Sequence, residues 1–163
     1  MWDKLKRQLN TERAQLNLLF QTHRAILSKC CRVEPGVDEI PALAAILHAF
    51  YSGVENLFKR IAVAMDGGTP EGEFWHSELL DAMAVARHNR PGAISPDLCE
   101  TSQDYLDFRH RFRHAYTFEL KWSRMASLVF AAEGTLKQLD AELDLFLSAI
   151  EPKPETKGTY LER

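Results

Sequence analysis

The segment from residue 40 to about residue 65 constrains the fold most strongly, because its apolar side chains recur at steps of three and four residues without a gap. An α-helix has 3.6 residues per turn, so this spacing places the side chains on one face of a helix. Additional apolar residues widen that face, which predicts the central core helix of the fold. The residues concerned are Ile40, Leu43, Leu47, Phe50, Val54, Leu57 and Ile61, widened by Ala44, Tyr51 and Phe58.

Similar spacing elsewhere predicts four more helices, over residues 2–31, from about 69 to 87, from 95 to about 116, and 123–150. The pairs Thr69-Pro70 and Ser95-Pro96 are typical of an N-cap followed by proline in the first turn. We found no alternating β-branched run and no Asn-Gly turn that would indicate strands. The short connections between the helices favour antiparallel packing. The sequence therefore predicts an all-α fold, an antiparallel bundle of about five helices.

Length and composition indicate how the chain is organised. It has 163 residues, of which 45% are hydrophobic, and these values suit a single globular domain with a substantial core. We expect this domain to span residues 1–150, and the polar tail of residues 151–163, with its two prolines, to be disordered. The net charge of −3 gives no indication of a nucleic-acid partner.

Several features bear on location and cofactors. No apolar run approaches the ~20 residues that span a bilayer, and the N-terminus lacks the apolar core of a signal peptide. We therefore expect a cytoplasmic protein that does not interact with membranes. The three cysteines lack the spacing of a zinc site or a redox pair, and we expect no cofactor.

The stretch from Phe108 to Arg124 differs from the rest of the chain in its charge. It contains five Arg or Lys residues and a single acid, Glu119, in a protein that is acidic as a whole. Aromatic residues are interleaved with the basic ones. Arginines can contact phosphates and aromatic rings can stack on bases, so this combination suits RNA binding.

A helical wheel separates the polar residues of this stretch. Arg109, Arg113 and Tyr116 lie at one edge of the core-facing stripe, whereas His110 and His114 lie on the opposite side. Arg109 and His114 are therefore ~140° apart on an ideal helix. If they act together, either the helix is distorted near its end or two copies of the chain bring their motifs together.

The residues alone leave other interpretations open. A basic helix face is most often only a solvated surface, and it can also belong to a non-catalytic helical module that docks an acidic partner or a nucleotide. Asp107, His110 and His114 have a spacing that could place metal ligands on one side of a helix. No other His or Glu cluster completes such a metal site in the sequence, so we assign no metal ligands.

The segment Arg109-His-Arg-Phe-Arg-His114-Ala-Tyr116 matches the pattern RxxxxHxY. It resembles the motif of HEPN-domain ribonucleases, in particular the HepT-type toxins of bacterial toxin–antitoxin pairs. As in that family, it lies near the end of the penultimate long helix. Residues 48–84 also look like the region that precedes the motif in HepT-like proteins, and the resemblance covers about residues 35–147. One departure is His110, because the family often has Asn or Asp after the motif arginine.

The resemblance implies a HEPN-like fold and a homodimer in which the two motifs face each other across a basic cleft. It also implies endonucleolytic cleavage of RNA without a metal ion. It implies a partner as well, a minimal nucleotidyltransferase (MNT-type) antitoxin that neutralises the toxin. In some such systems the antitoxin transfers AMP to the motif tyrosine, which is Tyr116 in this chain.

The chemistry of RNA cleavage suggests a role for each motif residue. The 2′-hydroxyl of RNA is the nucleophile, so the enzyme must move protons and stabilise charge on the phosphorane. Histidine, with an unperturbed pKa of ~6.5, can move protons, whereas arginine is permanently charged and binds phosphate with a planar fork. We therefore expect His114 to be the acid or base and Arg109 the phosphate clamp, with products that end in a 2′,3′-cyclic phosphate.

Four other residues complete the predicted site. Arg111 and Arg113 are expected to hold the RNA backbone, and His110 is an auxiliary candidate. Glu55, an acid on the predicted core helix, either orients a motif side chain or forms an ion pair at the edge of the core.

Overall fold

The computed structural model describes residues 1–153, and this part of the chain folds into six α-helices and one short 3-10 helix. No β-strand occurs in these residues, so the prediction of an all-α bundle is confirmed, with six α-helices in place of about five. Most of the predicted disordered tail lies outside the described residues. The helices are α1 (Trp2–Thr22), α2 (Arg24–Cys30), α3 (Ile40–Met65), α4 (Trp75–Ala84), α5 (Pro96–His114), the 3-10 helix η1 (Thr117–Glu119) and α6 (Trp122–Ile150).

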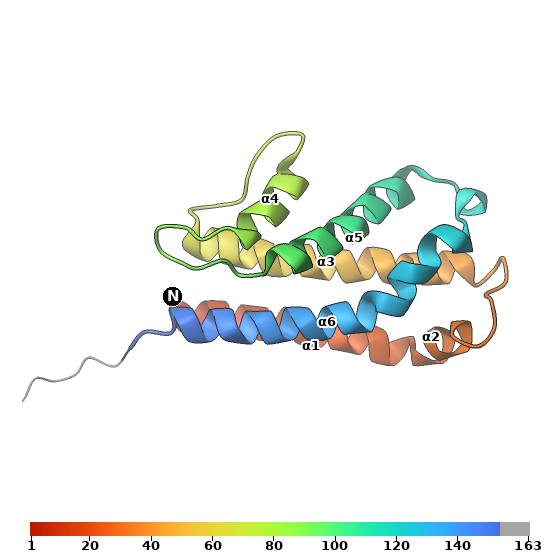
Figure 1. The fold of residues 1–163 in the computed structure, drawn as a ribbon, viewed down its shortest axis with the longest axis horizontal. Helices are drawn as coiled ribbons and strands as arrows, with labels where there is room; N and C mark the ends of the chain where they lie inside the picture. The colour runs from red at the N-terminus through yellow and green to blue at the C-terminus, as the bar shows by residue number, and fades with distance from the viewer. Residues whose placement is uncertain (154–163) are drawn as a thin grey trace, which may run out of the picture.

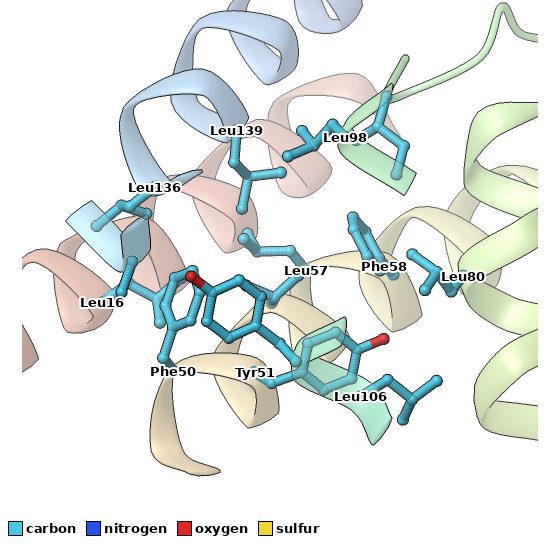
Figure 2. Close-up of a cluster of buried hydrophobic side chains, with 14 of the residues drawn as sticks. Leu16, Phe50, Tyr51, Leu57, Phe58, Leu80, Leu98, Leu106, Leu136 and Leu139 are labelled. Carbon is cyan, nitrogen blue, oxygen red and sulfur yellow. The ribbon is translucent and has the colours of Figure 1, made fainter. Parts of the chain in front are cut away.

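Helix α3 is the centre of the bundle, as its apolar face predicts. It contacts α1, α4, α5 and α6, and successive long helices run in alternating directions (Figure 1). Figure 2 shows aromatic side chains of α3, among them Phe50 and Phe58, enclosed by leucines from the surrounding helices. One core therefore fixes the position of α3 relative to α4 and α5, the helices that form the site described below.

The first predicted helix, over residues 2–31, is wrong in one respect: it is divided at His23, which separates α1 from α2. No proline or glycine marks this break in the sequence. The apolar side chains of this segment also differ in how deeply they are buried. Phe20 and Leu27 are buried, whereas Leu19 and Ile26, which fit the same apolar spacing, are only partly buried.

The third predicted helix was placed too early. Thr69 and Pro70 belong to a loop, and α4 begins only at Trp75. The reason is Gly72, which lies inside the predicted helix and has a φ angle of 103°, a value that an α-helix does not contain. The Ser95 cap is confirmed, because its hydroxyl accepts a hydrogen bond from the Leu98 N–H at 3.1 Å.

None of the helices within residues 1–153 is both long enough and apolar enough to cross a membrane.

The close approach of α1 to α3 depends on Gly53. A Cβ atom at this position would lie 2.4 Å from Cδ2 of the buried Leu16, whereas one at Gly134 in α6 would meet no atom within 4 Å. We expect Gly53→Ala to lower the free energy of unfolding by about 1–2 kcal/mol, because overpacking outweighs the better helix propensity of alanine.

Gly134→Ala is the matched control, and we expect it to raise the free energy of unfolding by up to about 1 kcal/mol. Thermal unfolding followed by circular dichroism measures both variants, with a shift of roughly 2–4 °C per kcal/mol for a chain of this size. If Gly53→Ala were as stable as Gly134→Ala, the result would contradict the close packing of α1 on α3 at Gly53.

Candidate functional site

A buried carboxylate, Glu55, lies at the centre of a polar cluster between α3, α4 and α5. Its Oε2 atom is 2.5 Å from Nδ1 of His76 and 2.8 Å from Nη2 of Arg109. Its other oxygen, Oε1, is 3.4 Å from Nζ of Lys59, one turn further along α3. The cluster therefore joins an acid from the central helix to a histidine at the start of α4 and to the motif arginine of α5.

The cluster holds Glu55 in its ionised form. Burial by itself would raise the pKa of this carboxyl, but the hydrogen bonds from His76 and Arg109 and the charge of Arg109 outweigh the effect of burial. As a result its pKa lies below the ordinary value. Glu55 thus carries a negative charge at neutral pH and compensates the buried guanidinium of Arg109.

Arg109 is held firmly against α3. Its side chain is only 5% exposed, and its Cζ lies 5.0 Å from the ring centroid of Tyr51. Its Nη1 atom makes a long contact of 3.4 Å with the hydroxyl of Ser52, and its buried Nε has no hydrogen-bond partner among the described residues. Nη2 is therefore fixed by Glu55, while Nη1 makes only the long contact to Ser52 and Nε makes no hydrogen bond within this part of the chain.

The cluster borders an open hollow of about 380 Å³. The surrounding side chains come from α3, α4 and α5, and most of them are polar. Burial, together with the charges of Arg109 and Arg113, lowers the pKa of His48, so this histidine is neutral at neutral pH. The residues that line the hollow are His48, Ser52, Glu55, Asn56, Lys59, Trp75, His76, Arg109 and Arg113.

The structure brings some of the predicted site residues together and keeps others apart. Glu55 and Arg109 form an ion pair, one of the two roles considered for Glu55, and Arg113 lines the same hollow. The exposed His110 lies beside it, with its ring centroid 5.5 Å from that of His76. The partial burial of its ring and, to a smaller extent, the charges of His76 and Arg109 lower the pKa of His110.

Two other predicted residues lie away from the hollow. His114 is exposed at the last position of α5 and is not among the side chains that line the hollow. Arg111 instead borders a separate hollow of about 180 Å³, together with Lys121 and Arg124. The structure of one chain therefore does not combine Arg109 and His114 in a single pocket, in agreement with their separation on the helical wheel.

The helical-wheel position that put Tyr116 near Arg109 does not apply, because Tyr116 lies outside the helix. The prediction extended the helix to about residue 116, but α5 ends at His114, and Ala115 has an extended backbone with ψ of 144°. Tyr116 instead precedes η1, where it is 70% exposed. Its ring stacks on that of Phe118, with centroids 5.3 Å apart.

The sequence interpretation missed two histidines. No motif marks His76, and its partners Glu55 and Arg109 come from other helices. His48 could have been found, because it lies seven residues before Glu55 on the same helix and hence on the same face. Within residues 1–153 there is no group of three or more His, Cys, Asp or Glu that could hold a metal ion, so Asp107, His110 and His114 do not form one.

The fold and the site together define an all-α bundle protein with a charged polar site between its central helix and the helix that carries the Arg/His motif. A comparison with models of protein families agrees with this class and identifies the family. The model of the HepT-like protein family matches residues 42–150, and the chain belongs to that family. Neither a curated protein nor a solved structure gives a significant match to the chain.

Proposed function

We propose that this protein is the toxin of a toxin–antitoxin pair and acts as a metal-independent endoribonuclease. The observation that carries the proposal is the buried Arg109, which is fixed by Glu55 at the edge of an open polar hollow in a HepT-like fold. A cation held in place before substrate arrives stabilises developing phosphorane charge without reorganisation. Arg113, exposed on the next turn of α5, would bind an adjacent phosphate.

The proposed enzyme is a homodimer. His114, the expected acid or base, is exposed at the end of α5 and does not line the hollow that contains Arg109. A two-fold axis beside the end of α5 would place His114 of one copy over the hollow of the other. RNA bound across the two copies would then meet the phosphate clamp of one chain and the proton-transfer group of its partner.

Cleavage of RNA by the purified protein tests the proposal. We expect wild-type protein to cut RNA and His114→Ala to lose at least 100-fold in rate, as is typical when an acid or base is removed. The melting temperature of this variant should remain unchanged, because the side chain is exposed. Binding of RNA without any cleavage would instead favour the alternative function, a non-catalytic module that docks nucleic acid or an acidic partner.

The proposed partner is a nucleotidyltransferase antitoxin that transfers AMP to Tyr116. In its favour, the Tyr116 side chain is 70% exposed and lies two residues beyond the end of α5, in a segment with basic neighbours. An attached AMP adds a bulky group and a negative phosphodiester just beyond the end of the helix that carries the arginines.

We expect co-expression with the antitoxin to increase the intact mass of the protein by AMP units, and Tyr116→Phe to remove the increase. The variant should keep its fold, since Tyr116 is an exposed residue and the ring remains. Intact-mass spectrometry measures the effect, with Phe118→Leu as a control that alters the stacked ring but leaves the acceptor hydroxyl. An unmodified protein that the antitoxin still inhibits fully would contradict AMPylation and indicate inhibition by steric capture.

A further inference from the structure

His76 is held in the site by contacts on two sides. Its Nδ1 faces the carboxylate of Glu55, and its ring stacks on that of Trp75 with centroids 3.7 Å apart. The side chain is 15% exposed, and it lines the same hollow as Arg109. The ring is therefore fixed in orientation while one part of it reaches the hollow.

The partners of Nδ1 determine which nitrogen of His76 carries the proton. Arg109 offers only donors, and the ionised Glu55 offers only acceptors. A lone pair on Nδ1 would face the carboxylate oxygen at 2.5 Å and be repelled, whereas an N–H at this position donates to Glu55. Nη2 of Arg109, 2.9 Å from Nδ1, then donates to the same carboxylate at 2.8 Å and not to the histidine. The neutral ring consequently bears its proton on Nδ1, and Nε2 has a free lone pair.

We propose that His76 is a catalytic residue whose Nε2 acts as the general base for RNA cleavage, in the same chain as Arg109. The inference rests on the proposed function and deepens it. A histidine whose Nδ1–H is bound by a carboxylate has the tautomer and orientation that a general base requires. Nη2 of Arg109 lies 2.9 Å from Nδ1 of His76 and both side chains line one hollow, so a phosphate bound to Arg109 in this hollow would be close to the ring.

The proposed step balances in protons and bonds. Nε2 of His76 removes the proton of the 2′-hydroxyl, and O2′ forms a bond to phosphorus. The bond from phosphorus to O5′ breaks, and the leaving oxygen takes a proton from the imidazolium of His114 on the other copy. The products are a 2′,3′-cyclic phosphate and a 5′-hydroxyl, and exchange with water restores both histidines.

The test is the cleavage rate of His76→Asn, with His88→Asn as the matched control. The asparagine amide can still donate to Glu55 but cannot accept a proton, and His88 is an exposed loop residue outside the hollow. We expect kcat to fall about 100-fold or more in His76→Asn, with RNA binding and melting temperature close to wild type. If His76→Asn does not fold, His76→Gln is used in its place.

A substrate with sulfur in place of O5′ distinguishes a base from an acid, because its leaving group needs no proton. With this substrate the cleavage rate of His114→Ala should recover, whereas the cleavage rate of His76→Asn should stay low. If wild-type protein cuts RNA and His76→Asn matches the His88→Asn control, or is restored by the sulfur substrate, the role of His76 as the base is wrong while the proposed function stands. If wild-type protein does not cut RNA at all, both fail.

Discussion

Arg109→Ala is expected to lower the free energy of unfolding by about 3 kcal/mol and to abolish RNA cleavage. Removing one partner of a buried ion pair leaves the other charge uncompensated, which typically costs about 3–5 kcal/mol. We take the lower end of this range because His76 and Lys59 still contact Glu55. Chemical denaturation measures the change in stability, and the combination with Glu55→Gln should recover part of it by removing the unpaired charge.

The decrease in the free energy of unfolding caused by Arg109→Ala should depend on pH. The pKa of Glu55 is lower in the folded protein than its ordinary value, so its contribution to stability is fully present at neutral pH. It is lost as pH falls below about 4.3 and through the folded pKa. The difference in stability between wild-type protein and Arg109→Ala should therefore narrow on acidification. A difference that stays constant with pH would contradict the ion pair as its cause.

Because Arg109 supports the fold, alanine alone does not isolate its role in catalysis. Arg109→Lys is the better variant for activity, since it retains a positive charge for Glu55 but lacks the planar fork that binds phosphate. We expect this variant to be more stable than Arg109→Ala while its cleavage remains strongly impaired. Wild-type cleavage by Arg109→Lys would contradict a phosphate clamp that depends on the guanidinium.

Mixing two inactive variants is expected to restore RNA cleavage if Arg109 and His114 act across a dimer. Heterodimers of Arg109→Lys with His114→Ala contain one site with both residues intact and one site with neither. Purified heterodimers carrying two different tags should regain about half of the wild-type activity, because one of the two sites of a dimer is complete. The structural basis is that His114 does not line the hollow of its own chain.

The control is a single chain that carries both substitutions, paired with wild-type chain. In a shared site this pair has no complete site, since each site takes one residue from the double variant. Activity in this control without activity in the mixed heterodimer would show that Arg109 and His114 act within one chain, and the proposed arrangement across the dimer would be wrong.

The sequence predicts the fold more completely than the site, and particular residues show why. The apolar spacing of α3 identifies its buried face, and Ser95 with Pro96 identifies the start of α5. Both are local signals, in which near neighbours determine the structure. The break at His23 has no local signal, and the positive φ angle of Gly72 prevents a helix from starting at the apparent cap at Thr69.

The site depends on contacts between residues far apart in the sequence. Glu55, His76 and Arg109 come from three different helices, and no spacing along the chain relates them. A helical wheel correctly separates Arg109 from His114, but it does not reveal that Arg109 is buried against α3. It also fails for Tyr116, because α5 ends before that residue.

The chemical nature of the cleaved ends, determined in the presence of EDTA, tests the central claim most directly. Purified wild-type protein is incubated with a defined RNA, and the product ends are identified by mass spectrometry. The proposed mechanism predicts cleavage without added metal, with a 2′,3′-cyclic phosphate on one product and a 5′-hydroxyl on the other. Cleavage that requires magnesium, or products with 3′-hydroxyl and 5′-phosphate ends, would contradict it.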